Sequence, residues 1–220
     1  MILKLAKRYG LCGFIRLVRD VLLTRVFYRN CRIIRFPCYI RNDGSINFGE
    51  NFTSGVGLRL DAFGRGVIFF SDNVQVNDYV HIASIESVTI GRDTLIASKV
   101  FITDHNHGSF KHSDPMSSPN IPPDMRTLES SAVVIGQRVW LGENVTVLPG
   151  TIIGNGVVVG ANSVVRGSIP ENTVIAGVPA KIIKKYNHET KLWEKHSRCF
   201  CGQFYHWRSI YHFEKIFGSN

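Results

Sequence analysis

The chain has 220 residues, of which 44% are hydrophobic and 20% charged, and a formal net charge of +9. This composition is ordinary for one globular domain with short appendages. No stretch approaches the ~20 apolar residues that a membrane-spanning helix needs, and Arg16 and Arg19 interrupt the apolar region that a signal peptide would require. The five cysteines are odd in number and scattered, which favours reduced thiols and a cytoplasmic protein.

The net positive charge belongs to the N-terminal arm, residues 1–45. Residues 1–41 hold ten Lys or Arg and one acidic residue, Asp20, which gives the net charge of +9. The charges of the remaining residues therefore sum to zero. Apolar residues between these charges are spaced for one or two helices with an apolar stripe, which we expect to cap a repeat domain or pack on a neighbouring chain. A basic amphipathic helix also suits an anionic membrane surface, so peripheral membrane contact through residues 1–41 is an alternative. Nucleic acid is not an expected partner, because no recognition motif accompanies the basic residues.

A six-residue spacing of aliphatic and aromatic residues begins in the next segment, residues 46–185. Its first two runs are Phe70, Val76 and Ile82, and then Ile90, Ile96 and Ile102. Residues 85–89 are out of phase between these runs, which predicts a small insertion at a corner. Phe48 and Gly49 belong to a less regular entry coil.

The spacing is strict in the second half of this segment. It places aliphatic side chains at Ile135, Leu141, Val147, Ile153, Val159 and Val165. A strand alternates every two residues and a helix turns every 3.6, so a period of six fits neither alone. It fits a solenoid whose flat faces are each one short strand, with Gly136 and Gly142 among the small residues that let the chain turn a corner.

The period stops between Asn106 and Ser131. This stretch holds Pro115, Pro119, Pro122 and Pro123 and shows no aliphatic repeat. A long structureless insertion inside a repeat is typical of a functional loop, and the alternative is a tolerated surface excursion.

The chain resembles the left-handed parallel β-helix (hexapeptide-repeat) acyltransferases, in particular the galactoside, maltose and polysaccharide O-acetyltransferases. The resemblance covers about residues 46–185. Three stretches carry it: VTIGRDTLIASKVFITDHNHG (88–108), VVIGQRVWLGENVTVLPGTIIGNGVVVGANSVV (133–165) and IPENTVIAGVPAKIIKK (169–185). It implies a mainly β fold, acetyl-CoA as co-substrate, no metal, and a homotrimer whose active sites lie between subunits.

His105 is the expected general base. Neutral imidazole suits removal of a hydroxyl proton near pH 7, and the resemblance places the family's catalytic His at the position of His105 in ITDH. His107 is the second choice. Asp104 either orients the imidazole or caps the turn, and we count it with His107 in the acceptor site. No Ser or Cys lies in a nucleophile motif, which favours direct transfer in a ternary complex.

The resemblance also assigns a set of residues to acetyl-CoA. We expect Trp140 to point outward beside the pantetheine arm, where backbone contacts also run, and basic side chains to bind the 3′-phosphate. This set is Trp140, Gly142, Glu143, Ala161, Arg166, Lys181 and Lys184. The oxyanion donor is expected to be a backbone N–H near Gly142. Relatives carry Thr-Lys where this chain has Arg166-Gly167, so the phosphate contact shifts by one residue.

The acceptor is the least defined part of the site. By its distance from the VTIG repeat, Asn77 matches the family's acceptor-binding Asn, and Glu86 is a weaker second candidate. The insertion sequence differs from that of the galactoside enzymes, so the resemblance does not identify the sugar.

Residues 186–220 are rich in aromatic side chains, and we expect a helical C-terminal extension that packs on the coil or on a neighbour. A zinc site from Cys199, Cys201 and nearby histidines is an alternative, but the Cys-x-Cys spacing is unusual for zinc.

The leading functional prediction is an acetyl-CoA-dependent O-acetyltransferase acting on a glycan or polysaccharide precursor. Two alternatives stay open: N-acylation of a nucleotide-linked amino sugar, for which the arm lacks a βαβ pattern, and a non-catalytic β-solenoid scaffold. A γ-type carbonic anhydrase has the same solenoid, but His81, His105 and His107 have the wrong spacing for its metal ligands.

Overall fold

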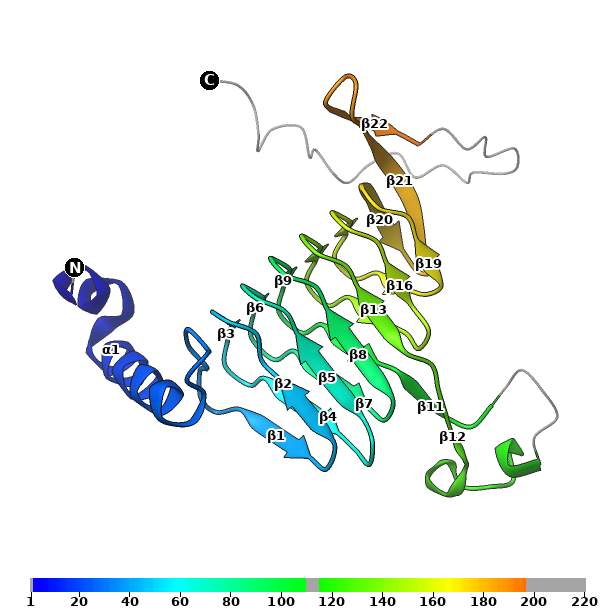
Figure 1. Cartoon of the computed structure of the whole chain (residues 1–220), viewed down its shortest axis with the longest axis horizontal. Helices are drawn as coiled ribbons and strands as arrows, with labels where there is room; N and C mark the ends of the chain where they lie inside the picture. Colours follow the sequence, from blue (N-terminus) through cyan, green and yellow to red (C-terminus); the bar gives the residue numbers. More distant parts are fainter. Residues whose placement is uncertain (1, 110–114, 197–220) are drawn as a thin grey trace, which may run out of the picture.

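The computed structural model describes residues 2–109 and 115–196. Most of them form a parallel β-solenoid with three flat faces, as the six-residue spacing predicts (Figure 1). Each face is one sheet, named here after its first strand. Successive coils contribute one short strand to each sheet in turn, so the strands of one sheet come from different coils.

The β1 sheet contains, in stacking order, β1 (Tyr39–Asn42), β4 (Arg59–Ala62), β7 (His81–Ser84), β10 (Phe101–Thr103), β15 (Thr146–Val147) and β18 (Val164–Val165). The β2 sheet contains β2 (Ser45–Asn47), β5 (Val67–Phe70), β8 (Ser87–Ile90), β13 (Val133–Ile135), β16 (Ile152–Ile153) and β19 (Ser168–Ile169). The β3 sheet contains β3 (Thr53–Ser54), β6 (Gln75–Val76), β9 (Leu95–Ile96), β14 (Trp140–Leu141), β17 (Val158–Val159), β20 (Thr173–Gly177), β21 (Ala180–Asn187) and β22 (Leu192–Lys195).

The core is the stack of aliphatic side chains that the spacing identified. All six residues of the strict run are at most 1% exposed, and so is every residue of the two earlier runs except Val76, at 2%. A second buried set lies two residues before each member of the strict run, and only Val139 of this set was expected to point inward. Its members are Val133, Val139, Val145, Thr151, Val157 and Ser163. Each corner therefore buries a small residue in addition to the aliphatic residue of the following strand.

Corner glycines are required because successive coils approach closely. A Cβ on Gly136 would lie 2.7 Å from Asn155 Oδ1, and a Cβ on Gly142 would lie 2.7 Å from the Ala161 amide nitrogen. Real Cβ atoms essentially never approach so closely. Any larger residue at these two positions would push the coils apart.

Three edges separate the faces. The β1–β2 edge is where each coil passes from the β1 sheet to the β2 sheet, the β2–β3 edge follows it, and the β3–β1 edge closes the coil. Residues 85–86 form a corner on the β1–β2 edge. The predicted corner insertion is thus shorter than residues 85–89, because Ser87–Ile90 is a regular strand with Val88 and Ile90 buried.

The long insertion leaves the stack at the β1–β2 edge and projects from it (Figure 1). It is not structureless, as the sequence suggested. Strands β11 (His105–His107) and β12 (Leu128–Ser130) form an antiparallel ribbon, followed outward by the 3-10 helices η1 (Pro115–Ser117) and η2 (Pro123–Met125). Asp104 begins the insertion and Ser131 ends it, with the Ser131 amide donating to the Asp104 carbonyl at 2.8 Å.

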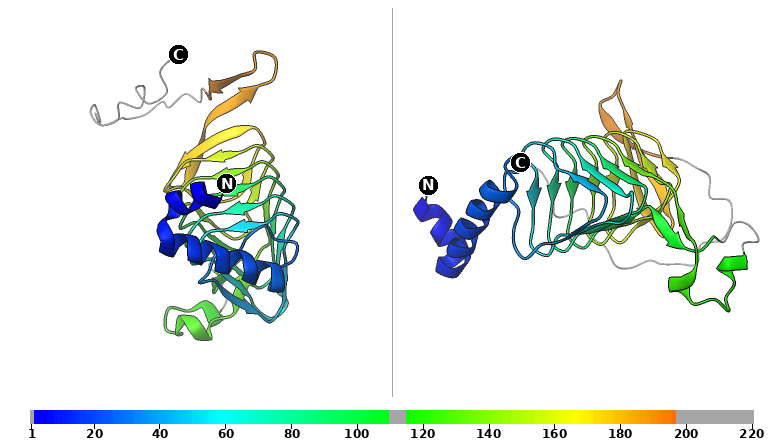
Figure 2. Two further views of the ribbon diagram at one scale, coloured as in Figure 1. Left: turned by 90° about the vertical axis from the view of Figure 1, so that its left-hand side faces the viewer. Right: turned by 60° about the horizontal axis from the view of Figure 1, so that its bottom comes forward.

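Helix α1 (Ile2–Phe27) lies across the N-terminal end of the stack (Figure 2). Gly10 has non-helical backbone angles and divides it into two helices, which agrees with the prediction of one or two helices in this segment. The second helix is held by polar residues: Asp20 and Thr24 are buried, and the Ile34 amide donates to Thr24 Oγ1 at 2.8 Å. No helix among the described residues is long and apolar enough to cross a membrane.

The apolar residues of α1 are divided between two faces, one of which is exposed. Its members point away and are 43% to 73% exposed: Leu11, Ile15, Val18, Leu22 and Val26. Phe14, Leu17 and Val21 are half-buried on the other face, beside the buried Asp20 and Thr24. The expected packing on the end of the repeat domain therefore concerns this second face, and the exposed face has no partner within the described part of the chain.

The described part of the C-terminal extension is a β-hairpin. Strand β21 runs to Asn187 and pairs with β22, so residues 186–195 are not helical as expected. Tyr186 and Trp193 pack edge to face across the hairpin at 5.2 Å between ring centroids, which explains the aromatic residues here. Residues 197–220, with Cys199 and Cys201, lie outside the described residues.

Candidate active site

His105 lies at the β1–β2 edge, at the first position of strand β11 in the insertion. Its ring is mostly buried, with a side chain 13% exposed. Ring atom Nδ1 lies 2.9 Å from Asp104 Oδ1 and 3.3 Å from Thr103 Oγ1. Adjacent residues on a strand point to opposite faces, but here the chain leaves the strand at Asp104, so the carboxylate and the ring meet.

The Asp104 carboxylate is fully buried and joins two coils. It accepts hydrogen bonds from Ser84 Oγ at 2.7 Å and from the amides of Ile85, Glu86 and Ser87 on the preceding coil, at 2.8 to 3.2 Å. Burial would raise the pKa of Asp104, but the hydrogen bonds from His105, Ser84 and the Ile85 and Glu86 amides outweigh it and lower that pKa. Asp104 therefore has no exposed surface for an acceptor, and its position suits orienting the imidazole and capping the turn.

The charged state of Asp104 fixes the tautomer of His105. A carboxylate with a lowered pKa is ionised at neutral pH and only accepts hydrogen bonds. Nδ1 of the neutral ring must then carry the proton and donate it to Asp104, which leaves the lone pair on Nε2. The ring is arranged to accept a proton through Nε2.

The other predicted residues of this edge differ in their surroundings. Glu86 is exposed and lies at the corner that Asp104 caps, with its amide 2.9 Å from Asp104 Oδ2. His107 lies farther along the ribbon, is exposed, and its Nδ1 donates to the Pro123 carbonyl at 3.1 Å. Within residues 2–109 and 115–196 no carboxylate is bonded to the His107 ring, so its geometry there suits it less well as a base.

A hollow of about 520 Å³ lies beside the base of the insertion. Its walls come from three levels of the stack: Asn106 with residues 129–131, residues 148–150, and Arg166 with Gly167. Arg166 thus shares the β1–β2 edge with His105. This volume is within the range of small-molecule sites.

Most residues expected to bind acetyl-CoA lie elsewhere on the chain. Trp140 points outward from the β3 sheet, as predicted, and is 50% exposed. Glu143 and Ala161 are exposed at the β3–β1 edge. Lys181 and Lys184 are exposed on β21, which pairs with β20 at the end of the β3 sheet. Arg166 is therefore separated from the two lysines within one chain.

The Gly142 amide already donates a hydrogen bond inside the stack. It donates to the Val159 carbonyl at 2.9 Å. The prediction that a backbone N–H near Gly142 stabilises the oxyanion therefore does not hold for Gly142 itself. Gly142 serves the close approach of two coils.

Asn77 is also on the β3–β1 edge. Its side chain is exposed at the corner between β6 and β7. This edge and the β1–β2 edge lie on opposite sides of the β1 sheet, which is roughly five residues or about 17 Å wide. Within one chain the structure does not bring Asn77 or Trp140 together with His105.

The structure also contains a charged cluster on the outer face of the β1 sheet, which the sequence pattern did not predict. Asp61 is buried beneath Arg41, Arg59 and His81, with Arg41 donating from Nε and Nη2 at 2.7 and 2.9 Å. Burial is the largest influence on the pKa of His81 and lowers it, although the Asp61 hydrogen bond opposes this effect. Register explains the cluster: β1, β4 and β7 align Arg41 with Asp61 and Arg59 with His81. Among the described residues, no three His, Cys, Asp or Glu side chains form a group able to hold a metal ion.

Comparison with known proteins agrees with this fold. Residues 132–167 match the family model of the bacterial transferase hexapeptide (six repeats). The chain is 33% identical, over 62% of its length and 72% of the relative's, to a dTDP-4-amino-4,6-dideoxy-D-glucose acyltransferase of Escherichia coli. It is 31% identical to the galactoside O-acetyltransferase of Escherichia coli K12, over 70% of this chain and 61% of the relative. The chain belongs to the hexapeptide-repeat acyltransferase family.

A solved structure supports the fold. A single-residue mutant of the N-acyltransferase AntD from Bacillus cereus, in complex with dTDP-4-amino-4,6-dideoxyglucose and coenzyme A, superposes with a TM-score of 0.50 at 24% identity, over 73% of this chain and 84% of the other. The chain matches only 36% to 61% of the length of three of its curated relatives.

We predict that Asp104→Asn lowers the free energy of unfolding at pH 7 by about 2–4 kcal/mol, because hydrogen bonds to a charged group contribute about 1.5–3 kcal/mol each. The carboxylate stabilises the fold fully above the unfolded-state pKa of about 3.9, and this contribution is lost as pH falls through the lower folded-state pKa. Urea unfolding of both proteins at neutral and acidic pH should show the difference shrinking below about pH 4. The exposed Asp124→Asn is the control, and equal stabilities of wild type and Asp104→Asn at pH 7 would contradict the role.

Proposed function

We propose that the chain is an acetyl-CoA-dependent O-acetyltransferase that transfers acetyl to a sugar hydroxyl of a glycan or polysaccharide precursor. The observation that carries the proposal is the Asp104–His105 pair, in which a buried carboxylate with a lowered pKa lies 2.9 Å from His105 Nδ1 and leaves Nε2 as the acceptor nitrogen of the neutral ring. Membership of the acyltransferase family and the similarity to a galactoside O-acetyltransferase support it.

The pair is suited to general-base catalysis. His105 Nε2 removes the proton from the acceptor hydroxyl as its oxygen attacks the thioester carbonyl carbon. The C–S bond then breaks, and His105 returns the proton to the leaving thiolate, so that the products are an acetyl ester and the free thiol. Asp104 keeps Nδ1 protonated throughout and stabilises the imidazolium that forms between the two proton transfers.

We predict that His105→Ala lowers kcat by about 10²–10⁴-fold and leaves the affinity for acetyl-CoA within about twofold of wild type, because the ring moves a proton and does not hold the donor. Release of free thiol in the presence of a glycan acceptor measures the rate, and calorimetry measures donor binding. His107→Ala is the matched control and should keep most of the activity. Full activity of His105→Ala would remove this residue from the mechanism, and inactivity of His107→Ala alone would make His107 the base.

The distribution of predicted residues favours a homotrimer with sites between subunits. His105 and Arg166 occupy one edge of the prism, whereas Asn77, Trp140 and Glu143 occupy the β3 sheet and the β3–β1 edge. We propose that the β1–β2 edge of one copy faces the β3–β1 edge of the next, so that each site takes its base from one chain and most donor contacts from the other. Arg166 then approaches Lys181 and Lys184 of the neighbouring copy.

This arrangement predicts complementation between inactive variants. Trp140→Ala should weaken acetyl-CoA binding, since the exposed indole packs on the pantetheine arm. Unfolding and refolding an equal mixture of His105→Ala and Trp140→Ala should restore about a quarter of the wild-type rate, because each mixed trimer regains one intact site. Trp193→Ala, which removes another exposed Trp, is the control for donor binding. No recovery in verified mixed trimers would contradict shared sites.

N-acylation of a nucleotide-linked amino sugar is a second candidate. A relative named for such a reaction is matched over 72% of its own length. The same base serves an amine acceptor, since the amine also loses a proton during transfer. Product chemistry in the activity assay separates the two, because mild alkali hydrolyses an acetyl ester and leaves an amide intact.

We further propose a cytoplasmic protein that contacts the membrane surface through α1. The stripe of Leu11, Ile15, Val18, Leu22 and Val26 is exposed on a helix in a segment whose charges are almost all basic. An apolar stripe beside basic side chains matches the boundary between the headgroups and acyl chains of anionic lipid.

We predict that the protein sediments with phosphatidylglycerol vesicles and that binding falls as salt rises. The double variant Ile15→Glu/Leu22→Glu should lose at least 90%, about tenfold, of vesicle binding, because it places two charges in the stripe. Val178→Glu, at an equally exposed apolar position on the last coil, should bind as wild type does. Failure of the wild-type protein to sediment with these vesicles would contradict membrane contact.

A further inference from the structure

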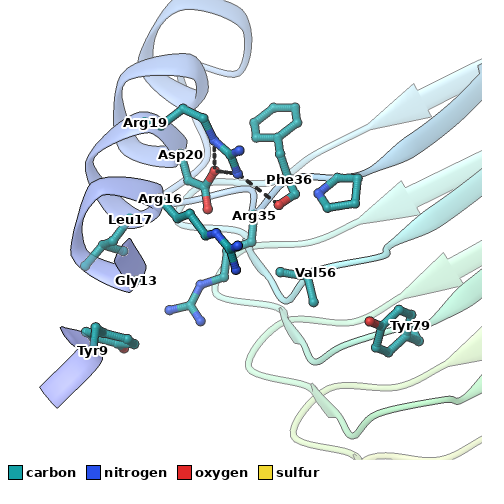
Figure 3. A pocket seen from close by; sticks show the side chains of 11 residues that line it. Tyr9, Gly13, Arg16, Leu17, Arg19, Asp20, Arg35, Phe36, Val56 and Tyr79 are labelled. Carbon is teal, nitrogen blue, oxygen red and sulfur yellow. Dashed lines mark hydrogen bonds and ion pairs between the residues drawn. The ribbon is translucent and has the colours of Figure 1, made fainter. Parts of the chain in front are cut away.

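A second hollow, of about 480 Å³, lies between α1 and the first coils at the β3–β1 edge. Figure 3 shows that Arg16 and Arg19 enter it from the helix, and Arg35 and Tyr79 from the coil side. Tyr9 and Tyr79 supply its aromatic walls, whereas the Phe36 carbonyl faces Arg19 and the Phe36 ring packs on the core. This volume suits a small molecule or one end of a larger one.

The wall of the hollow is held by Arg19. Its Nε and Nη2 lie 2.9 and 2.7 Å from Asp20 Oδ1, and Nη2 also donates to the Phe36 carbonyl at 3.0 Å. Asp20 is 3% exposed. The charges of Arg19 and Asp20 compensate each other, and the hydrogen bond to the Phe36 carbonyl ties the helix to the first coil. Arg19 is therefore poorly suited to bind an anionic ligand.

Arg16 and Arg35 differ from Arg19 because neither guanidinium has a carboxylate or hydrogen-bonding partner within the described part of the chain. Arg35 Nε is moreover buried, and it is the one buried side-chain polar atom of the described residues that lacks a hydrogen bond. A buried donor without a partner is costly, so native proteins rarely keep one without a reason. Asp78, next to Tyr79 in the sequence, forms no ion pair with either arginine in the described part of the chain, and its Oδ1 accepts from the Val56 amide at 2.8 Å.

We infer that this hollow binds a phosphate-containing group, and specifically the diphosphate that links an activated sugar to its carrier. Two unpaired guanidinium groups supply planar pairs of donors that match phosphate oxygens. The aromatic walls suit the apolar or stacked part of a carrier beside the diphosphate. Tyr79 lies against Gly57, whose missing side chain makes room for the ring: a Cβ there would be 2.4 Å from Tyr79 Cδ1.

The position of the hollow connects it to the acceptor. Tyr79 is two residues from Asn77 on the same edge, a separation of at most about 7 Å along the chain. A sugar attached to a diphosphate in the hollow can therefore extend along the β3–β1 edge toward Asn77. The assignment of this ligand to the acceptor rests on the proposed function, whereas diphosphate binding does not.

Binding is tested first without acetyl transfer. Calorimetry with inorganic diphosphate should detect binding to the full chain, weakened at least tenfold in Arg16→Met/Arg35→Met. Arg65→Met, which removes an exposed arginine at the β1–β2 edge, should bind as wild type does. The melting temperature should not fall in the double variant, because Met leaves no unpaired buried donor. Absence of binding to the wild type, or equal binding by the double variant, would overturn the inference.

The second arm identifies the carrier. A nucleoside diphosphate-sugar and farnesyl diphosphate are titrated in parallel, and the tighter ligand gives the source of the diphosphate. In the acetyl-transfer assay, KM for the matching diphosphate-linked sugar should rise at least tenfold in the double variant while kcat changes little. KM for a neutral oligosaccharide should stay constant. An inactive wild type with intact diphosphate binding would contradict the proposed function alone, and unchanged KM values would overturn the acceptor assignment.

Discussion

The stacking of each coil directly on the next is the constraint on which this molecule depends. Strand hydrogen bonds hold neighbouring coils at about 4.8 Å, and a Cβ on Gly91 would already lie 2.5 Å from the Gly136 carbonyl carbon. The register therefore decides the neighbours of every side chain. Thr103 pairs with Ala83, so the next residue, Asp104, lies over Ser84 and the corner that follows it. The carboxylate that orients His105 is placed by the repeat itself.

The repeat could be predicted because many residues share one spacing. Each of them independently indicates a side chain that points into the core. Trp140 was expected to point outward because Val139 takes the inward position, and its side chain is 50% exposed. The ribbon β11–β12 was not predictable, because three-residue strands such as His105–His107 carry too little pattern to distinguish them from a loop. The role of Asp104 was only half predicted. Its partners at 85–87 are distant in sequence, and only the coil register brings them to the carboxylate.

The spatial separation of the predicted residues has a physical cause. A solenoid of this kind has no internal cavity, since aliphatic side chains fill its axis, so a site must be built on an edge or a face. A convex edge alone encloses little surface and excludes little water. In the proposed trimer, the β1–β2 edge of one copy and the β3 sheet with its β3–β1 edge of the next form a cleft, in which His105 of one copy and Trp140 of the other can meet. Separation within one chain is thus an argument for assembly.

The N-terminal helix departs from a simple cap in a way that bears on the acceptor. A cap would bury its apolar stripe on the first coil, as the sequence suggested. Here Asp20 and Thr24 are buried at the contact beside the half-buried Leu17, and Leu22 with the other exposed apolar residues stays outside. The polar contact leaves room beneath the helix for Arg16 and Arg35, which a tightly packed apolar interface would have excluded. One helix thereby presents an apolar surface outward and cations inward, beside Tyr79 on the edge that carries Asn77. This arrangement fits a sugar delivered on a diphosphate carrier at a membrane surface better than a free sugar taken from solution.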